Sequence, residues 1–386
     1  MKIVHMSDSH LGFHKYNRVD DNDSNLIEER IYSSFNQTID KIVELKPDVV
    51  VHSGDVFHHT RPGVRSLYVF KQGLEKISNA GIPAIIISGN HDIPRTRATI
   101  SPFIIYEGIK NIHIAYKGKY ERFDVGNWTF HCIPFCADPN DNKFEFSKIE
   151  RSGRDVLIMH GMLKSFWDNR LDTVGEYELD DDSFLKSYFD YIALGHLHGQ
   201  HRVNGNTWYC GSVEYFNFKD SLQEKGILFV DLERKEFEQI RICQEKYWID
   251  CPPIDCREFN SEDMIAAISD QCNQNGLKDK ILKINLINVN RDVYRGIYNG
   301  VNHAKLRELK SLALSLEITP TYDEERKNDM KINRNNLQKE FVKFIQQQIL
   351  NISVSTAVKE KAIAYGADVM NGVISTRNAE DLNVSE

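Results

Sequence analysis

The residues best suited to chemistry follow apolar segments of the chain. Asp8 and His10 come directly after the apolar run at residues 2–7, and positions two apart on an extended segment point to the same side. Four later apolar runs also end in Asp, Asn or His, at Asp55, at Asn90 and His91, at His160, and at His196 and His198. Open α/β sheets place their binding sites at the C-terminal ends of strands. The pattern therefore predicts one site that all five segments share.

Two carboxylates, one amide oxygen and several imidazoles form a mixed set of metal ligands. Manganese, iron and zinc accept such a mixture, whereas magnesium and calcium prefer oxygen ligands alone. Seven ligands are too many for a single ion with open positions, so they favour two ions about 3.5–4 Å apart that share a carboxylate. A single histidine after a strand is usually a structural residue, but chance is a poor explanation for five such strand ends. Gly54, Gly89 and Gly195 precede these polar groups, where the backbone must turn tightly.

Alternating strand and helix patterns must position these residues. Apolar runs predict buried strands at 2–7, 48–52 and 83–87, and apolar residues at helical spacing predict helices over 25–45 and 63–80. Three strand–helix units in succession predict a parallel sheet covered by helices. Shorter strands follow at 111–115, 119–125, 127–134, 155–161, 188–198, 207–210, 226–232 and 236–243. They predict a second sheet, mixed or antiparallel, packed on the first.

The rest of the chain has a different pattern. Residues 247–318 predict a small α+β unit. Its predicted elements are helices at 261–273 and 302–313 and strands at 281–289 and 314–318. Residues 319–336 are polar and charged, which is typical of a linker. Two amphipathic helices are predicted within residues 337–373, and each has an apolar stripe that another surface must cover.

Composition limits the possible classes of protein. The length of 386 residues is typical of two or three domains, and a hydrophobic share of 41% is enough to form their cores. No apolar run approaches 18 residues and no secretory signal is present, so we expect a cytoplasmic protein. Seven cysteines without a Cys-x-x-Cys pair indicate reduced packing residues rather than disulfides or a zinc site.

The charge pattern leaves two interpretations open. The net charge of −8 is a weak argument against a nucleic-acid partner, because metal ions and a local basic patch supply positive charge. Basic side chains follow several proposed strand ends, at His14, Lys15, Arg18, Arg61, Arg65, Arg95 and Arg97. They could face a polyanion together, or they could be solvated charges on separate loops.

The ordered set of motifs resembles the calcineurin-like metallophosphoesterases. The matching segments lie within residues 1–235 and are Asp8-x-His10, Gly54-Asp55, Gly89-Asn90-His91-Asp92, His160-Gly161 and Gly195-His196-x-His198. Residues 55–62, and Tyr209–Glu214 followed by Lys225-Gly226, are similar to segments of the double-strand break repair nucleases of the Mre11 and SbcD type, especially the archaeal form. The resemblance implies an α/β fold of four layers, with two mixed sheets sandwiched between helices.

The resemblance also implies roles for individual residues. Metal one would be held by Asp8, His10, Asp55 and His198. Metal two would be held by Asp55, Asn90, His160 and His196. His91 would be the catalytic histidine, and His58 would act near the scissile phosphate. The candidate DNA contacts are Lys15, Arg18, Arg61 and Arg95. The family implies two Mn²⁺ ions per subunit, with Mg²⁺ as a less active substitute.

Domains and partners follow from the same resemblance. The implied divisions are a nuclease domain at 1–245, a DNA-contacting capping domain at 246–318, a linker at 319–336 and partner-binding helices at 337–373. The partner would be an SMC-like coiled-coil ATPase of the SbcC type. The family also forms homodimers through a four-helix bundle, here at residues 63–80 and 97–109. Apolar surface for the dimer would come from Leu67, Tyr68, Ile100, Phe103, Ile104 and Tyr106, unless all six face the sheet.

The implied function is manganese-dependent processing of DNA double-strand break ends at the nucleoid. It would combine 3′–5′ exonuclease action on duplex DNA with endonuclease action on single strands. A phosphomonoesterase or small-molecule phosphodiesterase with the same metal core is the alternative enzyme, and the long segment after the catalytic domain counts against it. A non-catalytic scaffold is the alternative from another class, and the presence of every ligand counts against it.

Overall fold

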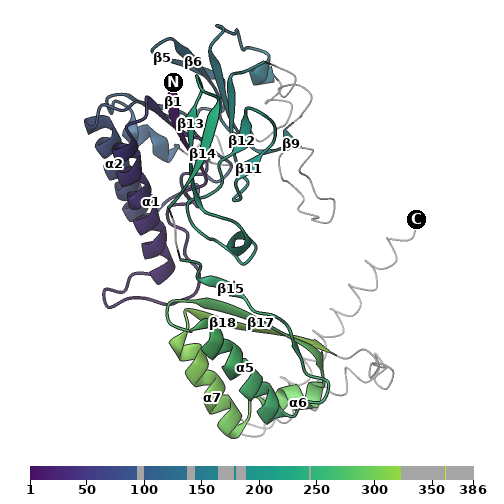
Figure 1. The fold of residues 1–386 in the computed structure, drawn as a ribbon. Coiled ribbons are helices and arrows are strands. Elements are labelled where there is room, and N and C mark those ends of the chain that lie inside the picture. Colours follow the sequence, from purple (N-terminus) through teal and green to yellow (C-terminus); the bar gives the residue numbers. More distant parts are fainter. Residues whose placement is uncertain are drawn as a thin grey trace.

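Two six-stranded sheets form the larger part of the protein in the computed structural model (Figure 1). The structure describes residues 1–93, 100–136, 144–163, 178–179, 188–242, 245–322 and 361. The first sheet contains, in spatial order, β14 (Glu236–Arg241), β13 (Gly226–Asp231), β1 (Lys2–Met6), β2 (Val49–His52), β3 (Ala84–Ile87) and β4 (Ile112–Ala115). The second contains β11 (His201–Arg202), β12 (Thr207–Tyr209), β10 (Tyr191–Gly195), β7 (Asp155–His160), β6 (Trp128–Ile133) and β5 (Glu121–Val125).

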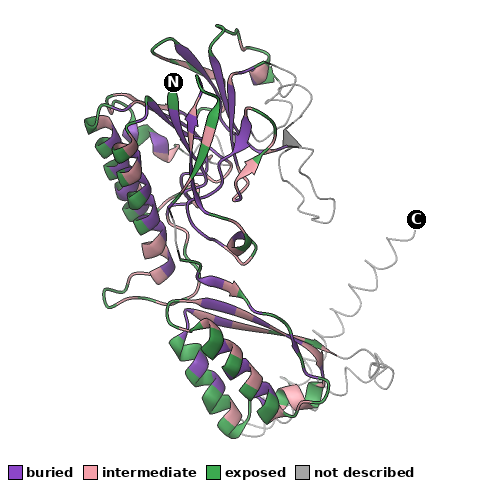
Figure 2. Ribbon diagram, in the orientation of Figure 1, coloured by how far each residue is buried: buried purple, intermediate pink, exposed green. Residues whose placement is uncertain are grey.

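β1, β2 and β3 run parallel, as the three strand–helix units predict, and β4 adds a further parallel strand beside β3. Helices α1 (Leu26–Leu45) and α2 (Val64–Asn79) cover one face of this sheet, and both bury an apolar stripe against it (Figure 2). The Asn25 side chain starts α1 by accepting hydrogen bonds from the backbone N–H groups of Ile27 and Glu28. The predicted bounds of both helices are confirmed to within one residue.

Three strands expected in the second sheet belong to the first. β13 pairs antiparallel with β1, placing Val230 opposite Ile3, and β14 pairs with β13. β4 pairs parallel with β3 at the opposite edge. The spacing of short strands along a chain does not reveal which free edge they join, and β1 and β3 each had an edge available. The first sheet is therefore mixed.

The core between the two sheets follows from alternation along the strands. On β1, Val4 faces α1 and α2, whereas Ile3 faces the second sheet. On β7, Ile158 faces the first sheet and Leu157 faces the outer apolar cluster. In the described part of the chain, residues 144–149 help to cover that outer cluster. Strands buried on both faces explain their nearly continuous apolar runs, and the predicted α/β fold with two mixed sheets is confirmed.

A smaller α+β unit contains four parallel-paired strands around β17. Its elements are β15 (Trp248–Asp250), β16 (Ile254–Asp255), α5 (Ser261–Asn275), β17 (Ile281–Val289), α6 (Arg291–Gly296), α7 (Gly300–Leu312) and β18 (Ser315–Tyr322). It has an apolar core of its own. The bounds of β17 match the prediction, but β15, β16 and α6 are too short for periodicity to reveal them. Within the described residues, the other short elements with given bounds are β8 (Met162–Leu163), β9 (Glu178–Leu179), η1 (Pro102–Tyr106) and η3 (Asp220–Leu222).

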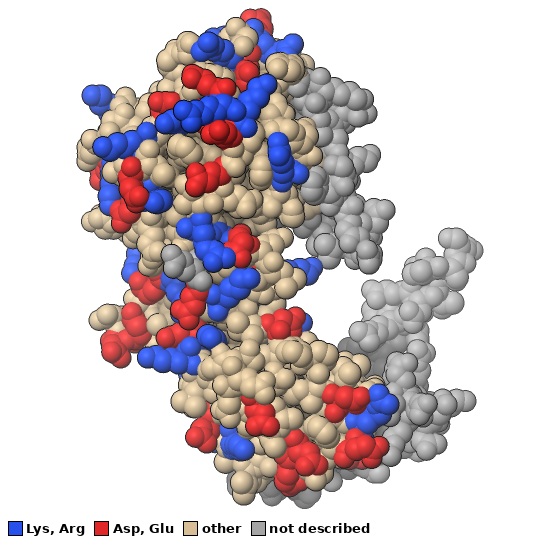
Figure 3. Space-filling view, viewed as in Figure 1, with Lys and Arg blue, Asp and Glu red and all other residues tan. Residues whose placement is uncertain are grey.

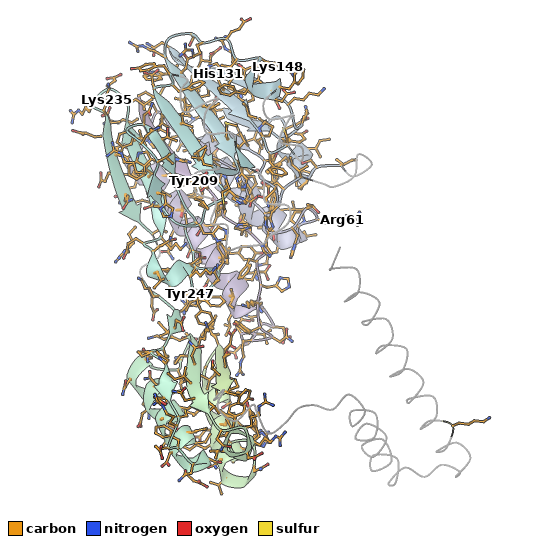
Figure 4. The ribbon with its side chains drawn as sticks, turned by 90° about the vertical axis from the view of Figure 1, so that its right-hand side faces the viewer. Arg61, His131, Lys148, Tyr209, Lys235 and Tyr247 are labelled. Carbon is orange, nitrogen blue, oxygen red and sulfur yellow. The ribbon has the colours of Figure 1, made fainter. Side chains whose placement is uncertain are left out.

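Aromatic side chains join the smaller unit to the two large sheets. Tyr247 lies at this junction (Figure 4), where its hydroxyl donates to the Tyr215 carbonyl at 2.9 Å. Trp248 Nε1 donates to the same carbonyl at 3.2 Å. The Tyr16 hydroxyl donates to Glu317 from the other side of the junction. The loop after β1, which carries the first candidate ligands, therefore also contacts the smaller unit.

The predicted helix at 97–109 is wrong over its described part, which contains only η1. Phe103 and Tyr106 are buried in the core beneath α2 and offer no surface to a second subunit. Tyr68, Ile100 and Ile104 are exposed. Three-residue spacing on a tight turn sends Phe103 and Tyr106 to the same inner side.

Other predicted elements lie outside the described residues. Most of the predicted linker and all but Lys361 of the predicted helices at 337–373 fall there. Within the described residues, no helix has both the length and the apolar character needed to cross a membrane.

Candidate metal centre

All seven predicted ligands meet at the C-terminal ends of five strands from both large sheets. His10 Nε2 lies 3.1 Å from His198 Nε2 and 3.7 Å from Asp55 Oδ2. His160 Nε2 lies 3.4 Å from the same Asp55 oxygen. Asn90 Oδ1 lies 3.0 Å from His160 Nε2 and 3.1 Å from His196 Nδ1. Asp8 joins the group through both carboxylate oxygens, which accept the His196 backbone N–H at 3.1 Å.

Unusual backbone geometry marks the same positions. Asp8, His10, Asp55 and His196 have φ values of 50°, 43°, 55° and 107°, a region that residues other than glycine rarely adopt. Hydrogen bonds hold this backbone: Asp8 N–H donates to Gly54 O at 3.0 Å, and His10 N–H donates to Asp55 O at 3.1 Å. Strained conformations persist where the surroundings enforce them, and they gather at functional sites.

Two glycines allow the ligand loops to approach each other. A Cβ atom on Gly89 would overlap the Asp55 carboxylate, with its Cγ only 2.8 Å away. A Cβ on Gly54 would lie 2.8 Å from His160 Cγ, and Gly54 also adopts a φ of 100°. The sequence predicted a tight turn at both positions. The structure shows a turn at Gly54 and close backbone approach at Gly89.

The donor set fits divalent metal ions. Two overlapping groups, Asp8 with His10 and His198, and Asp8 with Asp55 and His160, bring their ligand atoms within 4.8 Å of one another. Asp8 and Asp55 are buried, and a buried carboxylate needs a compensating positive charge. The two facing Nε2 atoms of His10 and His198, 3.1 Å apart, likewise favour a shared proton or cation between them.

The charges of the centre already favour a cation beside Asp55. Burial raises the pKa of Asp8. For Asp55, burial acts in the same direction, but the neighbouring imidazoles of His160 and His10 lower its pKa well below the ordinary range. Burial would lower the pKa of His160, yet Asp55 beside it raises that pKa to about 9. Asp55 thus favours positive charge at His160 Nε2, and a divalent ion bound there would replace the proton.

Comparisons with known proteins agree with this geometry. The protein is 34% identical to the DNA double-strand break repair protein Mre11 of Methanocaldococcus jannaschii, over 67% of this chain and 68% of that protein. Identity to the protein of the same name from Methanococcus maripaludis is 26%, over 95% of this chain and 96% of the relative. The family model of the calcineurin-like phosphoesterases matches residues 1–229. The chain belongs to the calcineurin-like phosphoesterases, in their Mre11 family. It is accordingly a metal-dependent hydrolase of phosphate esters.

Further contacts orient the imidazoles of the candidate ligands. His160 Nδ1 donates to the Ser53 carbonyl at 2.8 Å, which directs Nε2 towards Asp55. His10 Nδ1 lies 3.4 Å from His58 Nδ1, and His198 Nδ1 lies 3.4 Å from Asp220 Oδ2. Such contacts fix which ring nitrogen faces a metal.

His91 and His58 lie beside the candidate ligands. The His91 backbone N–H donates to Asp55 Oδ1 at 2.9 Å, and His91 Nδ1 donates to the His58 carbonyl at 2.8 Å. The His58 ring stacks on the His91 ring with 5.3 Å between centroids, and burial lowers the pKa of His58 to about 4. With His10 these rings form a third group of close imidazoles. His59, for which the motifs give no role, contacts the His58 ring.

Three of the four candidate DNA contacts belong to the described residues. Lys15 Nζ lies over the Trp248 ring at 4.9 Å, and Arg18 donates to the Lys310 carbonyl on α7. Arg61 is exposed at the edge of the larger part (Figure 4), and Arg95 lies outside the described residues. Basic and acidic side chains are also intermingled over the face in Figure 3. Among the described candidates, Lys15 and Arg61 are exposed and Arg18 is half-buried.

Sequence reasoning missed three buried charged residues around the centre. Asp92 accepts backbone N–H groups from Val56, Phe57 and Gly89 at 2.8–3.1 Å, so it ties two ligand loops together. Burial raises the pKa of Asp92 to about 7. The position of Asp92 directly after Asn90 and His91 could have indicated a role at the centre. Lys225 was quoted only as part of a motif, and Asp220 carried no signal because it lies 22 residues from His198.

Proposed function

We propose that this phosphoesterase is a manganese-dependent DNA nuclease that processes double-strand break ends together with an SMC-like ATPase. The observation that carries the proposal is the convergence of seven mixed oxygen and nitrogen ligands at one edge of two sheets. The Mre11 relatives support DNA as the substrate, and one of them aligns with nearly the whole chain. The implied products are those of 3′–5′ exonuclease action on duplex DNA and endonuclease action on single strands.

The proposed ligand sets divide the centre between two ions. Metal one takes Asp8, His10, Asp55 and His198, and metal two takes Asp55, Asn90, His160 and His196. Two divalent ions contribute +4 and the two carboxylates −2, so the loaded centre keeps a positive charge that suits a phosphodiester anion. When bound, such ions supply this charge and lower the pKa of water. Mixed oxygen and nitrogen ligation favours Mn²⁺ over Mg²⁺.

His91 is proposed as the residue that meets the leaving group. Its Nδ1 is occupied by the His58 carbonyl, so Nε2 is the atom left to face substrate. From there it donates a proton to the leaving 3′ oxygen or steadies the charge on the phosphate. His58 supports this arrangement, since its carbonyl anchors His91 and its ring packs between His91 and Phe13.

The proposed domain and partner assignments follow the family. Residues 1–245 form the nuclease domain, 246–318 a capping domain that contacts DNA, and 319–336 a linker. Residues 337–373 bind the ATPase. Lys15, Arg18, Arg61 and Arg95 contact the DNA backbone, with Lys15 and Arg61 the most accessible described members.

A homodimer is proposed through α2 and the segment around η1. Its apolar contacts come from Tyr68, Ile100 and Ile104, which are 59%, 73% and 46% exposed. Exposed apolar side chains gathered on one surface are typical of an interface. Light scattering at micromolar concentration checks this state.

The function is tested by comparing two substrates under the same conditions. The full chain with MnCl₂ should shorten end-labelled duplex DNA from its 3′ ends and turn over p-nitrophenyl phosphate poorly. An Asp55→Asn variant purified in the same way serves as the control for contaminating nucleases. Fast turnover of the monoester without DNA cleavage would favour the phosphomonoesterase instead. Adding the ATPase partner shows whether it changes the DNA products.

A further inference from the structure

A lysine is buried directly behind the metal centre. The Lys225 side chain is 0% exposed. Lysines are almost never fully buried unless their charge is paired. Its Nζ donates to the His198 carbonyl at 2.7 Å and to Ser212 Oγ at 3.0 Å. It also lies 3.8 Å from Asp220 Oδ1. These contacts place the ammonium group between the backbone of a proposed ligand and a buried carboxylate.

Asp220 links this lysine to the imidazole of His198. Its Oδ2 lies 3.4 Å from His198 Nδ1 and accepts the Phe216 backbone N–H at 2.9 Å. Its other oxygen faces Lys225. One carboxylate therefore contacts both the ring and the ammonium group, and the two opposite charges compensate each other in the protein interior.

The backbone of His198 is held from a second direction. Its carbonyl accepts the Ser212 backbone N–H at 3.0 Å, in addition to the Lys225 ammonium. Gly211 makes this approach possible, because a Cβ there would lie 2.9 Å from the His198 carbonyl oxygen and its φ is 77°. Both the ring and the main chain of His198 are thus fixed by residues from the Gly211–Lys225 segment.

We infer that Asp220 and Lys225 are positioning residues that hold His198 ready to bind one of the two metal ions. Asp220 accepts a hydrogen bond from His198 Nδ1–H, so His198 Nε2 is directed towards His10 Nε2. Lys225 balances the carboxylate and fixes the His198 carbonyl. The inference rests on the proposed function, since it requires His198 to be a ligand. Carboxylates behind ligand histidines typically change metal affinity about 10–100-fold.

The test is calorimetric titration of the metal-free full chain with MnCl₂. Asp220→Asn and Lys225→Met should each weaken one ion about 10–100-fold and leave the other at its wild-type affinity. Raising the Mn²⁺ concentration should then restore phosphodiester hydrolysis. Lys283→Met is the matched control, because Lys283 lies on β17 of the smaller unit, where it pairs with Asp250. It should bind both ions normally.

Two results of the Asp220→Asn titration would contradict the positioning role. Wild-type affinity for both ions in Asp220→Asn, or equal weakening of both ions, overturns the inference. Circular dichroism monitors folding, and if Lys225→Met does not fold, the isosteric Asp220→Asn decides the question. His198→Ala distinguishes the ligand role of His198 from the positioning role of Asp220 and Lys225. If His198→Ala retains both ions, the proposed ligand set fails. If it loses one ion while Asp220→Asn does not, only the positioning role fails.

Discussion

Replacing Gly89 by alanine should disable the metal centre through one added methyl group. The φ angle of Gly89 is not in the positive range, so alanine can adopt the same backbone conformation. The new Cβ would nevertheless lie 2.8 Å from Asp55 Cγ and overlap the carboxylate oxygen and backbone nitrogen of that residue. Relief of these contacts requires Asp55 to move by about 1 Å, and misplacement on that scale costs about 10²-fold in rate. Overpacking of this kind also lowers the free energy of unfolding by about 1–3 kcal/mol.

The assay pairs Gly89→Ala with Gly205→Ala. A Cβ on Gly205 meets no atom within 4 Å, so this control should match the wild type in stability and activity. Hydrolysis of bis-p-nitrophenyl phosphate with saturating MnCl₂ measures the rate, and urea unfolding measures stability. If Gly89→Ala hydrolyses the diester within twofold of wild type, the close approach of the Asn90 loop to Asp55 does not matter for catalysis and the reasoning is wrong.

Three further results are expected. His91→Gln should keep two bound Mn²⁺ ions by elemental analysis but lose about 10²–10⁴-fold in nuclease rate, and loss of metal along with the rate would contradict its role. Burial would raise the pKa of Asp155, but hydrogen bonds from His131 and nearby backbone N–H groups lower it to about 2. Asp155→Asn should therefore lower the free energy of unfolding by about 1–3 kcal/mol at pH 7. This loss should become smaller as the pH falls from 3.8 towards 2, because the wild-type carboxylate is then protonated. An equal loss in urea unfolding at pH 7 and pH 3 would contradict the role of the Asp155 charge. Truncation after Glu325 should leave the nuclease activity of the isolated subunit nearly unchanged and abolish co-purification with the ATPase, so undiminished co-purification would remove the assignment of residues 337–373.

The candidate ligands could be picked out from the sequence because each lies at or just after the end of a strand that is buried on both faces. Such a strand reads as an unbroken apolar run, and a polar residue at its end stands out. Asp8 and His160 are examples, although they lie on different sheets and 152 positions apart in the chain. Parallel strand order then brings the ends to one edge without further information.

The supporting residues could not be predicted in the same way. Asp220 and Lys225 contact His198 from the start of η3 and from the residue before β13, where the local sequence shows no periodicity. Their partners are fixed by the pairing of β13 with β1, which sequence spacing did not reveal. The burial of Phe103 could not be predicted either, because an apolar residue on a short turn can face the core or a partner.

The proposed function requires one cluster of side chains to hold two divalent ions around Asp55. Anomalous diffraction at the manganese edge, from crystals of the full chain grown with MnCl₂, would locate those ions. Two peaks about 3.5–4 Å apart are expected, one beside His10 and His198 and the other beside Asn90, His160 and His196, with Asp55 touching both. A single peak, or two peaks that do not share Asp55, would rule out this two-ion centre.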